Sequence, residues 1–135
     1  MAQLIDASVF ITLERRGQQI LDLPAIGLDE RVGIAAITAS ELLVGIHHAD
    51  SLEHRLQREA FVEAILEILP ILPFDLQVAR VHAQVWAQLA VRGQLIGDHD
   101  LLVAATALAH GYSLLTDNLR EYHRVPGLVA RRPNW

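Results

Sequence analysis

Short segments rich in apolar residues alternate along the chain with longer segments whose apolar residues recur every three or four positions. Residues 3–6 form a short apolar run that predicts a strand, residues 32–38 are β-branched and unalternating as in a strand covered on both faces, and residues 113–116 are a third strand candidate. Helical periodicity follows the first two, over residues 8–19 and 39–48. Strands that alternate with helices predict an α/β fold with three α/β/α layers around a short, mainly parallel central sheet.

Prolines and a glycine punctuate the first half of the chain. Pro24 and Gly27 predict a break before the second strand. Residues 52–69 are predicted to form an amphipathic helix on the surface, and Pro70 and Pro73 end it. The apolar positions of this helix are Leu52, Leu56, Ala60, Ile65, Leu66 and Leu69.

Two helices and an edge strand are predicted in the second half. Residues 75–91 repeat apolar positions at helical spacing, and Gly93 is placed to end that helix. Residues 97–111 are apolar almost all round, which predicts a buried helix. Residues 128–135 are a candidate edge strand.

Length and composition limit the possible classes of protein. The chain has 135 residues, of which 52% are hydrophobic, and this predicts one domain over residues 1–135. No apolar run reaches the roughly 20 residues that a membrane helix needs, so we expect no contact with a membrane. The N-terminus has no early basic region and Asp6 interrupts its apolar stretch, which argues against a secretory signal and favours the cytoplasm. The absence of cysteine leaves oxygen and imidazole ligands for any metal.

The net charge of −5 argues against a protein that attracts nucleic acid through a broad positive field. Carboxylates gathered in one metal site are an exception, because the bound cations neutralise them. The positions of the acidic residues therefore matter more than their number.

Acidic residues fall at the carboxyl ends of the predicted strands. Asp6 ends the first strand, Glu41 lies just beyond the second, and Asp117 directly follows the third. The carboxyl ends of parallel strands share one edge of the sheet, where ligands of open α/β folds bind. Asp100 lies in the first turn of the buried helix, where an acid among apolar neighbours needs a partner or a function. We expect the four acids to converge, and their mutual repulsion then favours a cation between them.

Helix capping is the alternative interpretation of each acid taken alone. Asp6 and Asp117 stand between a strand and a helix, where aspartate is a preferred N-cap. Glu41 lies three residues after Thr38, which is the spacing of a capping box. Asp100 would be stabilised by the positive end of its own helix. The residues alone leave both interpretations open.

Four segments around these acids resemble the acidic motifs of the PIN domain, in the same order and at normal spacing. They are LIDAS around Asp6, ITASELLVGI around Glu41, IGDHDLLVAATAL around Asp100 and LLTDN around Asp117. The closing segment REYHRVPGLVARRPNW resembles the tail of VapC-type toxins, so that the similarity covers essentially the whole chain. The resemblance implies a PIN-like fold and a metal-dependent endoribonuclease that is the toxin of a type II toxin–antitoxin pair, VapBC.

The resemblance also implies a cofactor. Oxygen ligands without cysteine favour Mg²⁺, with Mn²⁺ as a substitute. We expect Asp6, Glu41 and Asp100 to ligate the principal ion, while Asp117 completes its ligation or holds a second ion through water. Attack by metal-activated water would leave a 5′ phosphate and a 3′ hydroxyl on the cleaved RNA.

Polar neighbours are expected to support the site. The family's motif puts its acid four residues before an Ala-Ala pair, which selects Asp100 over Asp98 and leaves Asp98 as an N-cap or a solvated acid. Thr116 aligns with a position that is often Ser or Thr, and its hydroxyl would orient a carboxylate or a water. His99 is the strongest candidate among the histidines for a role in the site. The supporting polar residues are therefore Thr116, Asn118 and Ser8.

Expected partners follow from the same family. Guanidinium groups grip phosphates at two points, and the candidates for RNA contact, against the alternative of a solvated surface, are Arg15, Arg16, Arg120, Arg124, Arg131 and Arg132. VapC toxins imply a VapB-like antitoxin that obstructs the site, and a homodimer. Two rival functions remain open, namely a housekeeping PIN nuclease in RNA processing and a non-catalytic binding module that keeps the fold.

Overall fold

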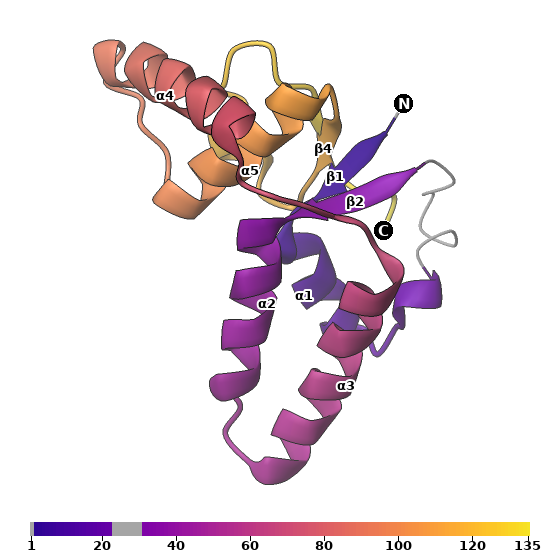
Figure 1. The fold of residues 1–135 in the computed structure, drawn as a ribbon. Coiled ribbons are helices and arrows are strands. Elements are labelled where there is room, and N and C mark those ends of the chain that lie inside the picture. Colours follow the sequence, from indigo (N-terminus) through magenta and orange to yellow (C-terminus); the bar gives the residue numbers. More distant parts are fainter. Residues whose placement is uncertain (1, 23–30) are drawn as a thin grey trace.

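In the computed structural model, which describes residues 2–22 and 31–135, five short strands form one parallel sheet. The strand order is β3-β2-β1-β4-β5, so β1 is central (Figure 1). The predicted parallel sheet is therefore confirmed. The strands are β1 Gln3–Ile5, β2 Val32–Ala35, β3 Ile71–Leu72, β4 Ser113–Leu115 and β5 Ala130–Arg131.

Helices cover both faces of this sheet. In Figure 1, α1, α2 and α3 lie on one side of the strands, and α4 and α5 lie on the other. The three predicted layers are confirmed. Among the described residues, no helix combines the length and the apolar character that crossing a bilayer requires. The helices are α1 Ala7–Arg15, α2 Ala36–His47, α3 Leu52–Ile68, α4 Leu76–Val91, α5 Asp98–His110 and α6 Leu119–Tyr122.

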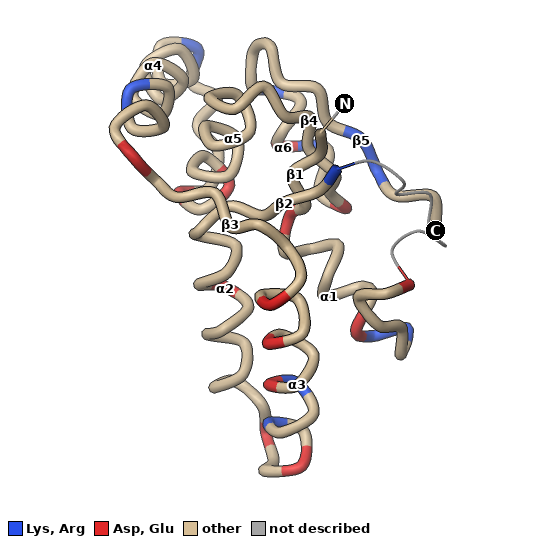
Figure 2. Tube along the Cα trace, turned by 45° about the vertical axis from the view of Figure 1, so that its right-hand side comes forward, with Lys and Arg blue, Asp and Glu red and all other residues tan. Residues whose placement is uncertain are grey.

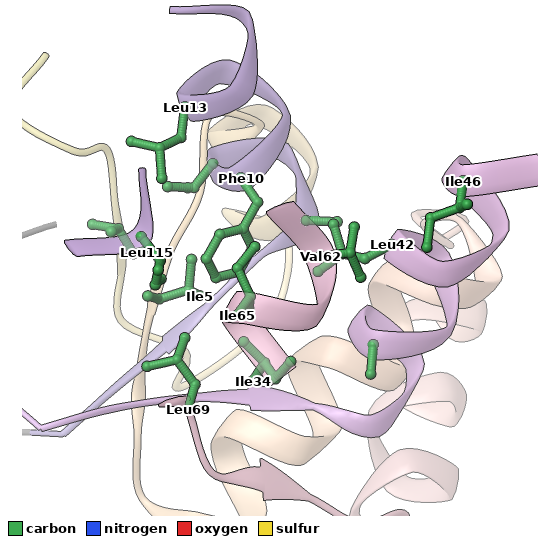
Figure 3. Close-up of a cluster of buried hydrophobic side chains, with 14 residues drawn as sticks. Ile5, Phe10, Leu13, Ile34, Leu42, Ile46, Val62, Ile65, Leu69 and Leu115 are labelled. Carbon is green, nitrogen blue, oxygen red and sulfur yellow. The ribbon is translucent and has the colours of Figure 1, made fainter. Parts of the chain in front are cut away.

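The strands carry apolar residues at successive positions because neighbouring side chains point to opposite faces of the sheet. Leu4 and Leu114 belong to the core cluster shared with α4 and α5. Ile5 and Leu115 belong to the cluster shared with α1, α2 and α3, where Phe10 packs among them (Figure 3). Burial on both faces holds β1 rigidly, and its carboxyl end is where Asp6 follows.

Two predicted element boundaries are wrong. The strand predicted over 32–38 ends at Ala35, because α2 already begins at Ala36 and carries Thr38 in its first turn. The helix predicted over 8–19 ends at Arg15, where Gly17 adopts a left-handed φ of 68° that stops the helix. The predicted break at Pro24 and Gly27 lies outside the described residues.

The amphipathic pattern predicted for residues 52–69 holds only at its C-terminal end. Ile65 and Leu69 are buried, but Leu52 and Leu56 are 72% and 58% exposed. Figure 1 shows why: α2 and α3 form a hairpin whose tip, where α3 begins, extends away from the sheet. The strand β3 went unpredicted because two residues between prolines show no periodicity.

Ile65 and Leu56 provide a matched test of this difference within one helix. Ile65→Ala should lower the free energy of unfolding by about 2–5 kcal/mol, because its side chain is fully buried. Leu56→Ala should change it by less than about 0.5 kcal/mol, because its side chain is exposed. Urea denaturation measures both values, and equal losses would contradict the exposed position of Leu56.

Candidate active site

Acidic side chains from three elements meet at the carboxyl edge of the sheet. Asp6 directly follows β1, Glu41 lies on α2 after β2, and Asp100 lies in the first turn of α5. The negative charge of Asp6 acts on both of the others and helps to raise the pKa of each. Figure 2 shows acidic positions gathered around the end of β1 and the nearby start of α5. The structure therefore places Glu41 and Asp100 within electrostatic range of Asp6, while the roles of the three acids as ligands stay a prediction.

Asp6 is held by hydroxyl groups from two directions. Its side chain is buried, with 5% of the residue exposed. Its Oδ2 accepts hydrogen bonds from Thr116 Oγ1 at 2.8 Å and from Ser8 Oγ at 2.9 Å. Its Oδ1 lies 3.4 Å from the hydroxyl of Tyr122. Two donors on Oδ2 stabilise the charged carboxylate and leave Oδ1 as the oxygen with more room for another ligand.

Among the acids of this group, Asp100 has the pKa that is shifted most. Burial raises its pKa to about 6, a hydrogen bond with the carboxyl of Glu121 and the charge of Asp6 add to the rise, and a hydrogen bond from Tyr122 opposes it. The Tyr122 hydroxyl donates to Asp100 Oδ1 at 3.1 Å. Burial, with the neighbouring charges of Asp6 and Asp100, raises the pKa of the Tyr122 phenol above its usual value, so this group remains a neutral donor.

Glu41 lies at the more open side of the group. Burial raises the pKa of Glu41, and the charge of Asp6 raises it further. The Nδ1 atom of His99 lies 3.9 Å from Glu41 Oε2 and opposes that rise. His99 is exposed. The position of this imidazole beside Glu41 agrees with the prediction that His99 is the strongest candidate among the histidines for a role in the site.

Asp117 is placed differently from the other acids. Its Oδ2 accepts a hydrogen bond from Thr12 Oγ1 at 2.6 Å, and its Oδ1 accepts one from Trp135 Nε1 at 2.8 Å. Its backbone N–H donates to Ser8 Oγ at 3.0 Å. Both carboxylate oxygens thus already have partners, and Asp117 links α1 to the C-terminal segment. The predicted contact of Asp117 with an ion stays a prediction.

The capping interpretation fails for Asp6, Glu41 and Asp117, whereas Asp100 lies in the first turn of α5, where the positive end of the helix favours an acid. Asp6 occupies the N-cap position of α1 but makes no capping hydrogen bond with its side chain. Thr38 and Glu41 both lie inside α2, so they form no capping box. Asp117 precedes the N-cap of α6. The N-cap of α5 is Gly97, so the N-cap interpretation of Asp98 is also wrong and the alternative of a solvated acid is confirmed.

The remaining predicted residues lie around this group. The backbone N–H of Asn118 donates to Thr116 Oγ1 at 2.9 Å, while the Asn118 side chain is exposed. Arg16 stacks its guanidinium on the ring of Trp135, 4.6 Å from the centroid. Arg124 donates to the carbonyl of Leu95 at 3.2 Å. Arg15 lines a groove that also reaches Glu41. The described contacts place none of the other predicted arginines against the acidic group: Arg120, Arg131 and Arg132.

Sequence reasoning missed two residues of the site, Glu121 and Tyr122. Both lie on α6, a helix of four residues that was read only as part of a family-like tail. The short turn that follows Thr116 carries them back over α5, where both reach Asp100. A glutamate and a tyrosine a few residues after the last strand-end acid were the available signal.

The donor set fits a divalent cation. Carboxylate oxygens from Asp6, Glu41, Asp100 and Glu121 lie at one edge, and the raised pKa values of Glu41 and Asp100 reflect burial and repulsion that a cation would relieve. Among the described residues, no three acidic or histidine side chains already stand close enough to enclose an ion. Such an open arrangement suits an ion that keeps several of its own waters.

Comparisons with known proteins agree with this geometry. Residues 4–128 match the family model described as PIN domain. The chain is 35% identical over 128 residues to "Ribonuclease VapC1" of Rickettsia felis, which covers 95% of this chain and 93% of that protein. The chain belongs to the PIN-domain family of VapC ribonucleases. The fold and the family expected from the four acidic motifs are confirmed.

This PIN domain is also similar to a second VapC protein and to a solved VapBC structure. It is 36% identical over 98 residues to "tRNA(fMet)-specific endonuclease VapC" of Salmonella typhimurium, covering 73% of this chain and 72% of that protein. The crystal structure of DNA-bound VapBC from Salmonella typhimurium superposes with a TM-score of 0.82 at 28% identity, covering 98% of each chain. The similarity in fold therefore extends over the sheet and all of its flanking helices.

The raised pKa of Asp100 predicts how stability depends on pH. Below the unfolded pKa the group is protonated in both states, and between that value and about 6 only the folded state keeps the proton. The metal-free protein therefore loses stability as the pH rises from the unfolded pKa of 3.8 to about 6, and above that pH the folded state carries the full cost of a half-buried charge. Asp100→Asn removes this cost, and it should raise the melting temperature in chelator more at pH 7.5 than at pH 5.

Asp98→Asn is the matched control on the same helix, because Asp98 is exposed. Its effect on the melting temperature should be small and similar at both pH values. Thermal denaturation followed by circular dichroism measures all three proteins. An Asp100→Asn gain that is the same at pH 5 and pH 7.5 would contradict the raised pKa of Asp100.

Proposed function

We propose that this PIN domain is a metal-dependent endoribonuclease and the toxin of a type II toxin–antitoxin pair. The observation that carries the proposal is the buried carboxylate of Asp6, with Oδ2 held by Ser8 and Thr116 and with Oδ1 beside the hydroxyl that also contacts Asp100. Burying one carboxylate next to others is costly unless a positive charge joins them. A divalent cation bound by the group supplies that charge.

Mg²⁺ is the proposed ion, with Mn²⁺ as its substitute, because the donors are oxygens and the site is open. Asp6, Glu41 and Asp100 are the proposed ligands. When bound, the ion supplies a nucleophilic water at neutral pH and polarises the scissile phosphate. Ser8 and Thr116 keep the Asp6 carboxylate in one orientation through Oδ2.

RNA is the proposed substrate, and the names of two relatives support it. The Rickettsia felis relative is named a ribonuclease, and the Salmonella typhimurium relative is named a tRNA(fMet)-specific endonuclease. We therefore propose transfer RNA as the first substrate to test. Arg15 and Arg120 are exposed and stay candidates for phosphate contacts, together with Arg16 and Arg124.

A VapB-like antitoxin is the proposed partner, since the similar Salmonella typhimurium structure is a VapBC assembly. A groove of about 320 Å³ between α1, α2 and α3 reaches Glu41, and Phe10 and Phe61 give it apolar walls. Such a groove would let a partner segment approach the acids. A homodimer, and the cytoplasm as the place where the protein meets RNA, are further parts of this proposal.

The first test compares wild type with Asp6→Asn after any co-purified partner has been removed. Wild type with Mg²⁺ or Mn²⁺ should cleave transfer RNA at discrete sites and leave 5′ phosphates, whereas Asp6→Asn should lose at least about 100-fold in rate because removing a ligand changes the ion's position. Sequencing of the new RNA ends measures both. Asp75→Asn is the matched control, since Asp75 caps α4 by accepting from the backbone of Val78 and asparagine can replace it.

Three outcomes separate this function from its rivals. Cyclic 2′,3′-phosphate ends would contradict hydrolysis by water. Equal behaviour of wild type and Asp6→Asn, without binding of divalent ions, would favour a non-catalytic binding module. Cleavage without toxicity when the chain is expressed in cells would favour a housekeeping nuclease.

The fourth acid can be identified with a pair of variants. Glu121 lies in hydrogen-bonding reach of Asp100, whereas both oxygens of Asp117 are engaged by Thr12 and Trp135. Glu121→Gln should weaken Mn²⁺ binding, measured by calorimetry, by about 10-fold or more. Asp117→Asn should mainly lower the melting temperature, because it disturbs the link between α1 and the C-terminal segment. The reverse result would make Asp117 the ligand.

A further inference from the structure

Tyr122 is the one fully buried side chain that touches two of the proposed ligands in the described residues. Its hydroxyl lies 3.1 Å from Asp100 Oδ1 and 3.4 Å from Asp6 Oδ1. These two aspartates come from different elements, one after β1 and the other from α5. The phenol hydroxyl therefore links the end of β1 to α5, next to the acids that are proposed to bind the ion.

The ring of Tyr122 is fixed by packing and not by its hydroxyl. It belongs to the core cluster that contains Leu4 of β1, Leu101 of α5 and Leu114 of β4. A fully buried ring in a packed cluster has little freedom to rotate or shift. The phenol oxygen therefore has a fixed position, and it constrains the two carboxylates that it contacts.

On Asp6 the hydroxyl contacts the carboxylate oxygen that the other hydrogen bonds leave unoccupied. On Asp6, Ser8 and Thr116 already occupy Oδ2, so that Tyr122 meets Oδ1. A hydroxyl has a single hydrogen and donates to one carboxylate at a time, while a carboxylate oxygen accepts more than one partner. Contact with Tyr122 therefore leaves acceptor capacity on both Oδ1 atoms.

We propose that Tyr122 is a positioning residue for the cation: its hydroxyl fixes the orientation of the Asp6 and Asp100 carboxylates that would hold the ion. The proposal rests on the proposed function, because it assumes that these acids bind a divalent ion. Hydrogen bonds from outside the ligand shell orient ligating groups, and their loss commonly weakens metal binding about 10–100-fold. The phenol thus acts through the aspartates and touches neither the ion nor the RNA.

Two other roles for the hydroxyl give different results. If it merely fills the space of the ion in the metal-free protein, its removal should tighten metal binding. If it only stabilises the core, its removal should lower the melting temperature and leave metal affinity unchanged. Metal affinity therefore separates the three possibilities, whereas loss of nuclease activity alone would not.

The test is Tyr122→Phe in the full chain, which keeps the packed ring and removes one oxygen. Titration calorimetry of the chelator-treated protein with Mn²⁺ should show affinity about 10-fold weaker than wild type. Tyr112→Phe is the matched control, because it removes the other tyrosine hydroxyl of the chain at a half-buried position outside the acidic group. Its affinity should equal that of wild type. Equal or tighter binding by Tyr122→Phe would overturn the proposal.

A spectroscopic measurement keeps the proposal falsifiable if Tyr122→Phe folds poorly. Addition of Mg²⁺ should change the near-ultraviolet tyrosine absorbance of wild type and of Tyr112→Phe, because the charge beside the Tyr122 hydroxyl changes. Absence of that change in proteins that do bind Mg²⁺ would overturn the positioning role. Absence of any binding of Mg²⁺ or Mn²⁺ by wild type would instead overturn the proposed function on which it rests.

Discussion

The structure depends on one unfavourable feature, a carboxylate buried at the end of the central strand. Asp6 follows β1, which is covered by helices on both faces, and 5% of the residue remains exposed. A charged group in that position must be hydrogen-bonded and neutralised by its surroundings. Ser8, Thr116 and Tyr122 supply the hydrogen bonds, and they come from α1, from the end of β4 and from α6.

The same constraint explains the order of the elements. Parallel pairing of β1 with β2 and β4 brings the strand ends to one edge, so hydroxyls and acids from distant parts of the chain surround Asp6. The turn after β4 then leads into α6, whose Glu121 and Tyr122 reach Asp100 on α5. Two layers of helices are thereby tied to a single strand end. Within the described residues no basic side chain pairs with Asp6 or Asp100, and this is the physical basis for proposing a cation.

Much of this arrangement could be predicted from the sequence, because the strongest signals are local. Unalternating apolar runs identified the strands around Leu4, Ile34 and Leu114, and the acids at their ends followed from the rule for parallel sheets. The family motifs then identified Asp100 in place of Asp98, and the exposed position of Asp98 agrees with that choice.

The features that could not be predicted depend on contacts between distant segments. The exposed apolar residues Leu52 and Leu56 have helical spacing, but the periodicity does not reveal that the α2–α3 hairpin extends beyond the sheet. The partners of Asp117 lie on α1 and near the end of the chain, at Thr12 and Trp135, and no spacing in the sequence relates them. Glu121 and Tyr122 were overlooked for the same reason, since a turn of four residues has no periodicity of its own.

The central claim is that the buried Asp6 carboxylate exists to hold a divalent cation together with Asp100. A crystal structure of the chain soaked with Mn²⁺, with the ion located by its anomalous scattering, tests this claim most directly. The account predicts an ion bound by Asp6 Oδ1 and Asp100, while Ser8 and Thr116 remain on Asp6 Oδ2. An ion bound at Asp117 and away from Asp6, or no ion at a concentration that saturates the protein in solution, would contradict it.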